Sequence, residues 1–182
     1  RHRAIEVLYQ DGFPSQSKRW YERLFYRVWF STSNAKAVKN RLFVVRAELA
    51  GQLKKLLEQH HKKINVLSIA AGSSRAVLEA VEDVPMPREA NLEVTFLDKN
   101  PAALTYSKEM FSHKNLPIEG NWVNDTVGNF LRNDNEHKYD IVEMVGLMDY
   151  FSNDKVIETF KQIRERLAPG GMLITGNIIP NS

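Results

Sequence analysis

Four short segments place small or polar residues directly after apolar runs. The first, Ala70 to Ser73, follows the apolar run Ile64–Ala70 and precedes a helical pattern. Small residues there let a ligand approach the backbone, and the N–H groups at the start of a helix point towards it. The second, Asp98-Lys99, ends another apolar run 26 positions after Gly72. A carboxylate so placed can accept both hydroxyls of a ribose, or it can cap a helix.

The third segment could bind a nucleobase. It follows the apolar run Ile118–Val123, and its amide and carboxylate could hydrogen-bond an adenine amino group; its residues are Asn124, Asp125 and Thr126. Capping of a helix that begins at this point is the alternative, because short polar side chains are favoured at helix N-termini.

The fourth segment could take part in proton transfer. Val145 and Gly146 end the run Tyr139–Val145, and Asp149 and Tyr150 follow shortly after. If the reaction involves a hydroxyl or an amine, a base within hydrogen-bond reach would help, and Asp149 and Tyr150 are the candidates. A purely structural role for Asp149 is the alternative.

The elements that position these segments alternate between strands and helices. Strands are expected at Ile64–Ala70, Leu92–Leu97, Ile118–Val123, Tyr139–Val145 and Met172–Thr175, and helices at Ser74–Val81, Pro101–Phe111, Val127–Asn133 and Asp154–Leu167. This order predicts an α/β fold, a Rossmann-like open and mainly parallel sheet with helices on both faces. Ligands of such sheets bind beyond the carboxyl ends of the strands, where all four segments lie.

A helical layer is expected before the sheet. Ser17–Phe30 and Ser33–His61 have helical apolar spacing, so we interpret residues 1–63 as a helical extension or lid and 64–182 as the ligand-binding domain. The first part carries 14 Lys and Arg against 5 Asp and Glu, the second 11 against 17. Either the basic layer attracts nucleic acid, or it docks on the acidic domain, and both interpretations stay open.

Composition excludes several classes of protein. The chain has no cysteine, so disulfides and thiolate metal sites are excluded, and no metal is expected. No apolar run approaches the roughly 18 residues of a membrane span. A cytoplasmic location is expected, with the oligomeric state undetermined. The turn at Gly72 lacks the G-x-G-x-x-G fingerprint of a pyrophosphate site, which disfavours a dinucleotide cofactor.

The segments together resemble the class I S-adenosylmethionine-dependent methyltransferases over Ile64 to Asn177. The resemblance is carried by VLSIAAGSS, FLDKNP, YDIVEMVGLMDYF and LAPGGMLIT. Ser68 departs from the usual acidic residue of the first motif, and Ala70 and Ser74 replace its first and last glycines. More narrowly, GLMDYF and LAPGGMLITGN look like a bacterial subgroup, some members of which make fatty-acid methyl esters. Full-length relatives add two further strands, so a C-terminally truncated domain is expected.

The resemblance implies methyl transfer from S-adenosylmethionine to a small-molecule or lipid acceptor, leaving S-adenosylhomocysteine. A nucleic-acid methyltransferase or binder that uses the basic helices is the first alternative, and a dinucleotide-dependent oxidoreductase the second. Tyr21 could belong to an aromatic lid over the sulfonium, or to a packed helix face. Arg41 or Arg46 could pair with the cofactor carboxylate. The cofactor-binding residues are expected to be Ala70, Ala71, Gly72, Ser73, Asp98, Lys99, Asn124, Asp125, Thr126, Val145, Gly146 and Tyr21.

Overall fold

The computed structural model describes residues 32–59, 63–134 and 136–177. Along the chain these form α3 (Ser33–Glu58), β1 (Lys63–Ile69), α4 (Arg75–Glu82), β2 (Asn91–Asp98), α5 (Pro101–Lys114), β3 (Glu119–Asn124), α6 (Val127–Asn133), β4 (Tyr139–Val145), the 3₁₀ turn η1 (Met148–Tyr150), α7 (Asn153–Arg166) and β5 (Leu167–Gly176). The strand–helix alternation expected from the sequence is therefore confirmed.

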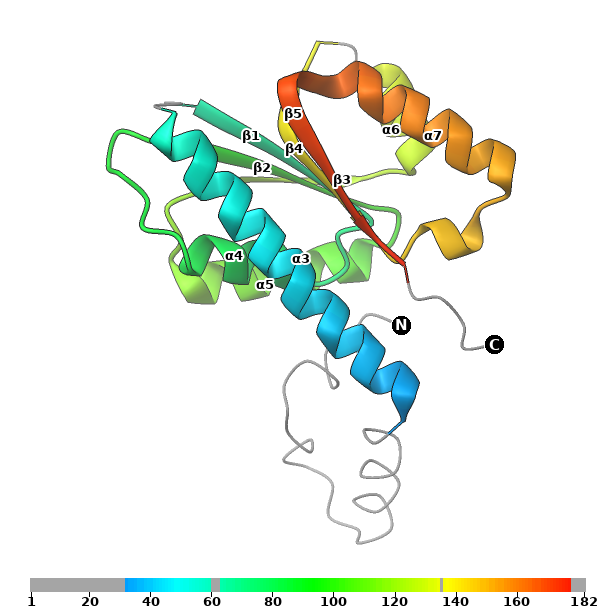
Figure 1. Ribbon diagram of the computed structural model, residues 1–182, viewed down its shortest axis with the longest axis horizontal. Coiled ribbons are helices and arrows are strands. Elements are labelled where there is room, and N and C mark those ends of the chain that lie inside the picture. The colour runs from blue at the N-terminus through cyan, green and yellow to red at the C-terminus, as the bar shows by residue number, and fades with distance from the viewer. Residues whose placement is uncertain (1–31, 60–62, 135, 178–182) are drawn as a thin grey trace, which may run out of the picture.

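The five strands form one parallel sheet in the order β3-β2-β1-β4-β5. The chain builds outward from β1 in one direction and then returns to the other side of it with β4 (Figure 1). The order therefore reverses between β1 and β4. In an open parallel sheet this reversal opens a crevice at the carboxyl ends of the strands, where ligands bind.

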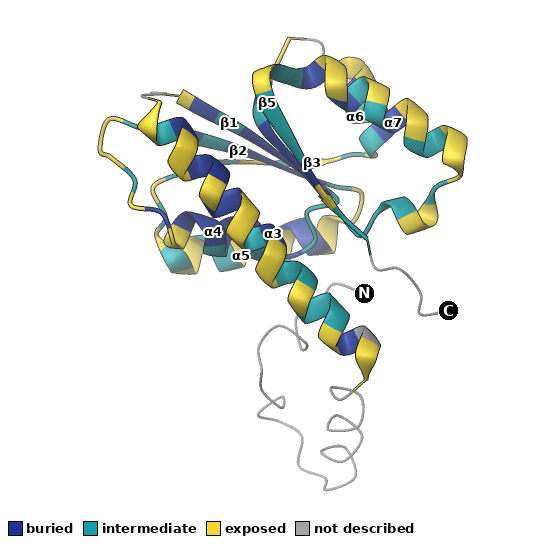
Figure 2. Cartoon of the chain, in the orientation of Figure 1, coloured by how far each residue is buried: buried dark blue, intermediate teal, exposed yellow. Residues whose placement is uncertain are grey.

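Helices cover both faces of the sheet. Helices α3, α4 and α5 lie on one face and α6 and α7 on the other, and the strands between them carry the most deeply buried residues (Figures 1 and 2). Alternate strand residues point to opposite faces, so Ile64 and Val66 join the core beneath α3 and α4 while Leu67 and Ile69 join the core beneath α6 and α7. Rossmann-like architecture with two covered faces is thus confirmed.

Helix α3 is part of the same core as the sheet. Its apolar stripe, Val45, Leu49, Leu53 and Leu56, is buried against the first core and packs on α4 and β5. Figure 2 shows the stripe facing the sheet while the outer side of the helix is exposed. The expected division of the chain at residue 63 stays a prediction, because residues 1–31, which include the expected helix Ser17–Phe30, lie outside the described residues.

The last strand is longer than the pattern predicted. A helix to Leu167 and a strand limited to Met172–Thr175 were expected, whereas β5 begins at Leu167, opposite Tyr139, and bulges before Met172 pairs with Ile141. The Pro169-Gly170-Gly171 sequence forms this bulge within the strand. A Cβ at Gly171 would lie 2.9 Å from the Tyr139 carbonyl oxygen, so only glycine lets the two strands approach here.

No helix within residues 32–59, 63–134 and 136–177 combines the length and apolarity needed to cross a membrane.

Candidate functional site

The loop between β1 and α4 has a strained backbone. Ala70, Gly72 and Ser74 all have left-handed φ angles, of 55°, 56° and 58°. Such angles cost residues with a Cβ roughly 1–2 kcal/mol each. The Ala71 N–H donates to the Leu97 carbonyl oxygen at 3.0 Å, which fixes the loop to the end of β2. Strain of this kind is concentrated at ligand-binding sites, where surrounding contacts hold it in place.

Asp98 joins the first two segments. Its Oδ2 accepts from the Gly72 N–H at 2.9 Å and its Oδ1 from the Asn100 N–H at 2.8 Å. An ionised carboxylate has about four acceptor positions, so two remain for a ligand. Asn124 is also held here, because its Nδ2 donates to the Asp98 carbonyl oxygen at 3.0 Å. The structure therefore brings three of the four segments together at the carboxyl ends of β1, β2 and β3.

A pocket of about 300 Å³ opens at this edge on the side of α6 and α7. We call it the nucleoside-side pocket. Five of its lining residues were expected from the sequence, namely Ala70, Asp98, Lys99, Asp125 and Thr126. The others combine apolar and basic side chains: Ile69, Leu97, Val127, Gly128, Asn129, Arg132, Leu147, Phe151 and Lys155. An apolar interior with a few polar groups at its rim is typical of small-ligand sites.

Asp125 and Thr126 also stabilise the start of α6. Thr126 is the N-cap residue and accepts from the Asn129 N–H, and both carboxylate oxygens of Asp125 accept from the Asn129 side-chain amide, at 3.0 and 2.8 Å. The capping alternative is thus realised in the structure, while both residues still line the pocket. The two interpretations are compatible.

A second pocket, of about 110 Å³, opens on the other side of β1, beneath α3 and α4. We call it the α3-side pocket. Expected residues in its lining are Ala70, Ala71, Gly72, Ser73 and Val145, together with Arg41, one of the two arginines considered for the cofactor carboxylate. The remainder are Leu42, Val45, Ser68, Ser74, Arg75, Ala76, Val77 and Glu143. Ala70 lines both pockets. A single extended ligand that passes over the end of β1 would occupy both.

Glu143 is a candidate site residue that the sequence reasoning missed. It lies within the apolar strand β4 with only 7% of its surface exposed, directly beside Ser68 of β1 in the strand register. The Ser68 hydroxyl donates to Glu143 Oε2 at 2.6 Å. Burial raises the pKa of the Glu143 carboxyl to about 7, against the opposing effects of the Ser68 hydrogen bond and the Arg41 charge. An acid between the buried apolar residues Val142 and Met144 was the available signal.

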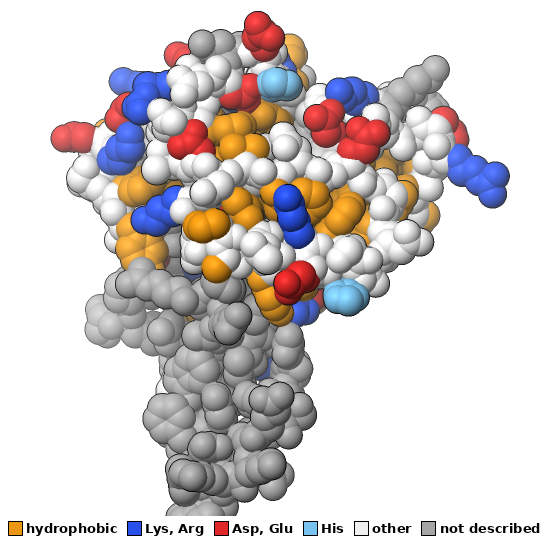
Figure 3. Space-filling view, turned by 180° about the vertical axis from the view of Figure 1, so that it is seen from behind, with side chains coloured by type: hydrophobic (Ala, Val, Ile, Leu, Met, Phe, Trp, Pro, Cys, Tyr) orange, Lys and Arg blue, Asp and Glu red, His pale blue; other side chains and the backbone are white. Residues whose placement is uncertain are grey.

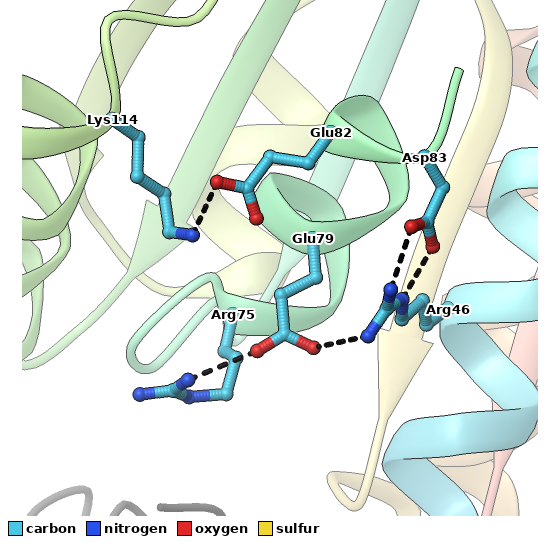
Figure 4. A network of polar contacts seen from close by, with 6 residues as sticks. All are labelled: Arg46, Arg75, Glu79, Glu82, Asp83 and Lys114. Carbon is cyan, nitrogen blue, oxygen red and sulfur yellow. Dashed lines mark hydrogen bonds and ion pairs between the residues drawn. The ribbon is translucent and has the colours of Figure 1, made fainter.

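Ionic contacts hold α3 over the site. The Arg46 guanidinium donates to Asp83 Oδ1 at 2.6 Å and to Glu79 Oε2 at 3.1 Å, both on or next to α4 (Figure 4). Arg75 pairs with the other oxygen of Glu79 at 2.9 Å. Arg46 therefore docks one helix on another, which matches the interpretation of a basic layer on an acidic domain. Arg41, five residues earlier on α3, lines the α3-side pocket instead.

Three residues predicted from the segment after β4, namely Gly146, Asp149 and Tyr150, line neither pocket, although Leu147 and Phe151 of the same segment line the nucleoside-side pocket. A Cβ on Gly146, whose φ is 68°, would lie 2.8 Å from Arg41 Nη1, so the guanidinium covers this glycine. Asp149 is exposed and its Oδ1 accepts from the Asn177 side-chain amide at 2.7 Å, and Tyr150 is 65% exposed. Tyr21 lies outside the described residues. Among those described, no group of three or more His, Asp or Glu side chains is placed to hold a metal ion.

Comparison with known families gives one match. A family model described as a methyltransferase domain matches residues 67–173, which include the end of β1, the whole of β4 and every residue of the nucleoside-side pocket. No curated protein matches the chain in sequence.

Comparison with solved structures shows the same fold elsewhere. A possible exported protein from Bordetella parapertussis has a TM-score of 0.69 at 20% identity, covering 96% of this chain and 53% of its own. A plantazolicin methyltransferase in complex with SAH has a TM-score of 0.55 at 17% identity, and the match covers 96% of this chain and 57% of that protein. An S-adenosylmethionine-dependent methyltransferase from Clostridium acetobutylicum has a TM-score of 0.56 at 14% identity, and the match covers 84% of this chain and 56% of that protein. The chain thus spans a little over half the length of each.

Proposed function

We propose a function from the premise that this chain belongs to the methyltransferase domain family, whose model matches more than half of it. That membership supports the predicted enzyme class, a methyltransferase, and we propose S-adenosylmethionine as its methyl donor. We propose that the donor lies across the end of β1, with its adenosine in the nucleoside-side pocket and its methionine in the α3-side pocket. The observation that carries this placement is the meeting of the two pockets at Ala70, beside the Asp98 carboxylate.

The nucleoside-side pocket has the chemistry that adenosine requires. Asp98 has two acceptor positions left for the ribose hydroxyls after its bonds to the backbone of Gly72 and Asn100. Apolar side chains of the lining, Ile69, Leu97, Val127 and Leu147, offer surfaces for the adenine ring. Asn124 and Asp125 are the proposed partners of the adenine edge, and Lys99 and Thr126 complete the rim.

The protein's contribution to methyl transfer is mainly alignment. Displacement at a sulfonium methyl needs the acceptor in line with the carbon–sulfur bond, and holding two reactants in that geometry lowers the barrier substantially. The segment after β4 is the proposed acceptor side, because it follows Val145 and Gly146 at the reversal point. Asp149 and Tyr150 are its proposed proton-accepting groups for a hydroxyl or amine acceptor.

We propose a small-molecule or lipid acceptor. The acceptor-side segment supports this with half-buried apolar side chains at Met148 and Phe151, which suit an apolar molecule better than a phosphate backbone. The narrower resemblance to enzymes that make fatty-acid methyl esters agrees with the same chemistry and stays a prediction.

A nucleic-acid acceptor is the alternative, and two observations weigh against it. Arg46 of the basic layer is used in contacts with Asp83 and Glu79. On the face shown in Figure 3, which is turned away from α3, Lys and Arg side chains stand apart among acidic ones, so the sheet domain presents no basic patch there. Binding to nucleic acid generally needs a continuous basic surface. The dinucleotide-dependent oxidoreductase is disfavoured by the family match.

The acceptor class can be tested with a labelled methyl group. The purified chain is incubated with S-adenosylmethionine labelled on the methyl carbon and, separately, with mixed fatty acids, total RNA and duplex DNA. Label that enters an organic extract of the fatty-acid sample and disappears with Asp98→Ala supports the proposal. Label precipitated with RNA or DNA, and absent from the organic extract, contradicts it in favour of the alternative.

A further inference from the structure

Ser74 adopts a backbone conformation that its side chain opposes. Its φ is 58° and its ψ is 14°, in the left-handed region, at the position where the motif has its last glycine. A residue with a Cβ is strained there, whereas glycine is not. Ser74 is also the N-cap residue of α4, yet its side chain makes no capping hydrogen bond, unlike an ordinary serine N-cap with extended backbone. Another contact therefore has to hold this residue.

That contact comes from α5. The Ser74 and Ser107 hydroxyl oxygens lie 2.6 Å apart, and both residues are buried. The Trp122 Nε1–H donates to the same Ser107 oxygen at 3.0 Å. An indole nitrogen only donates, so Ser107 accepts from Trp122 and has its own proton left to donate to Ser74. Side chains from β3, α5 and the β1–α4 loop thus form one chain of hydrogen bonds.

Trp122 is a rigid anchor for these hydrogen bonds. Its ring stacks on Phe96 with 5.2 Å between the centroids, and it meets the Phe111 ring edge-on at 5.1 Å. Gly120 leaves space for it, since a Cβ at that position would lie 2.3 Å from the Trp122 Cη2 atom. The Lys108 Nζ lies 5.4 Å from the ring centroid, where a cation is attracted to the indole. The indole N–H therefore has a fixed direction.

The conformation of Ser74 sets the turn at Gly72. The Ser74 N–H donates to the Ala71 carbonyl oxygen at 2.7 Å and closes this turn. Within the turn, the Gly72 N–H donates at 2.9 Å to the carboxylate of Asp98, the proposed partner of the ribose. If Ser74 relaxed to an ordinary φ, the turn would open and Asp98 would lose this donor. The strained serine therefore supports the carboxylate that would bind the ribose.

We infer that Trp122 and Ser107 are positioning residues for the donor site: through the Ser74 hydroxyl they hold the β1–α4 loop in the conformation that glycine would adopt unaided. The inference rests on the proposed function, because the donor is what this loop would bind. It gives a reason for the departure at Ser74 that the sequence shows. It also explains the serine at 107, which is 0% exposed and where alanine would pack without a polar atom to satisfy.

The importance of Ser107 should then depend on the residue at position 74. Ser74→Ala and Ser74→Gly both remove the hydroxyl, but only the alanine variant keeps the strain, so it should bind the donor more weakly than the glycine variant. Ser107→Ala should weaken binding in the natural chain and have no further effect in the Ser74→Gly background. A merely structural role for Ser107 would give the same loss in both backgrounds.

The first test is calorimetric titration of the whole chain with S-adenosylhomocysteine and with 5′-methylthioadenosine, which keeps the ribose but lacks the amino acid. We expect Ser107→Ala, Trp122→Phe and Ser74→Ala each to weaken both ligands about fivefold, the size of one neutral hydrogen bond. In the Ser74→Gly background, Ser107→Ala should change either affinity less than twofold. Ser112→Ala, an exposed serine of the same helix, is the matched control and should change neither.

The second test needs no ligand. Amide hydrogen exchange, measured by nuclear magnetic resonance on the free chain, reports how often the turn opens. Ser107→Ala should speed exchange at Gly72 and Ser74 about fivefold and leave the amides of β2 unchanged. The Ser74→Gly, Ser107→Ala double variant should exchange at Gly72 as slowly as Ser74→Gly alone.

Several results would overturn the inference while the proposed function stands. One is that Ser107→Ala weakens neither ligand, or weakens both equally in the two backgrounds. Another is a loss confined to S-adenosylhomocysteine, which would mean that Ser74 contacts the amino-acid end directly. Unchanged exchange at Gly72 in Ser107→Ala would overturn it as well. If neither ligand binds the unchanged chain, the proposed function fails, and the exchange measurement still decides whether Trp122 and Ser107 hold the loop.

Discussion

The two pockets at the end of β1 are built differently. The nucleoside-side pocket is formed by loops after β1, β2 and β3, and its polar groups are already hydrogen-bonded to backbone or to neighbouring side chains, as Asp98 and Asp125 are. The α3-side pocket is formed largely by a helix, a loop and two central strands. In it Glu143 is buried with the Ser68 hydroxyl as its donor, and Arg41 is half-buried with an Nε that has no hydrogen-bond partner among the described residues. Local hydrogen bonds fix the polar groups of the first pocket, whereas packing between α3 and the sheet fixes those of the second.

This difference predicts that the two pockets respond differently to substitution. Groups in the nucleoside-side pocket can be removed with little effect on folding, because the backbone contacts they make are near the surface. Groups in the α3-side pocket affect stability and binding in opposite directions, because a buried charge kept for binding destabilises the unbound protein.

Asp98→Ala should have the largest effect and should act on both ligands. It removes the acceptors of both ribose hydroxyls, and hydrogen bonds to a charged group contribute roughly 1.5–3 kcal/mol each. We expect at least a 30-fold loss of affinity for S-adenosylhomocysteine and for 5′-methylthioadenosine, measured by calorimetry. Asp154→Ala, an exposed carboxylate in the first turn of α7, is the matched control. A loss confined to S-adenosylhomocysteine would contradict the assignment of Asp98 to the nucleoside.

Glu143→Gln should stabilise the protein at alkaline pH. The pKa of this carboxyl is raised from 4.5 to about 7 in the folded chain. The neutral carboxyl therefore contributes fully to the free energy of unfolding below pH 4.5, and this contribution is lost as the pH rises through 7. Glutamine has no such loss, and we expect the variant to gain roughly 1–3 kcal/mol relative to the natural chain between pH 5 and pH 8. Urea unfolding at both pH values measures it. An unchanged difference would show that Glu143 is not buried as described.

Arg46→Ala should distinguish docking of α3 from direct ligand contact. The Arg46 contacts with Asp83 and Glu79 are more than a third exposed at the arginine, so their loss should cost no more than about 1 kcal/mol and less in 1 M salt. Since these contacts position the helix that carries Arg41, affinity for S-adenosylhomocysteine should fall a few-fold. Arg88→Ala, in the exposed loop before β2, should change neither. A tenfold loss with Arg46→Ala would instead indicate that Arg46 touches the ligand.

Ala70→Gly should have the smallest effect, and it should change the free energy of unfolding in the opposite direction to Ala71→Gly. Ala70 has a φ of 55°, which glycine adopts without penalty, so we expect the variant to gain about 0.5–1 kcal/mol. Ala71 is not left-handed, and Ala71→Gly should lose a similar amount through unfolded-state entropy. Thermal unfolding of the pair checks this. Equal losses in both would show that the strain at Ala70 is absent.

Features that depend on neighbouring residues could be predicted from the sequence, whereas features that depend on strand pairing could not. Asn100 followed by Pro101, and Thr126 before Val127, are local signals, and the helices they begin were placed at the right residues. Asp98 could be assigned to the ligand site because its position at a strand end is also local. Glu143 could not, because its meaning depends on the register that sets it beside Ser68, 75 positions away.

The measurement that tests the account most directly is titration of the purified chain with S-adenosylmethionine and, separately, with NADH. The account predicts saturable one-to-one binding of S-adenosylmethionine, lost in Asp98→Ala, and no binding of NADH, because the loop at Gly72 lacks the glycines that a pyrophosphate needs. Binding of NADH with no response to S-adenosylmethionine would contradict it.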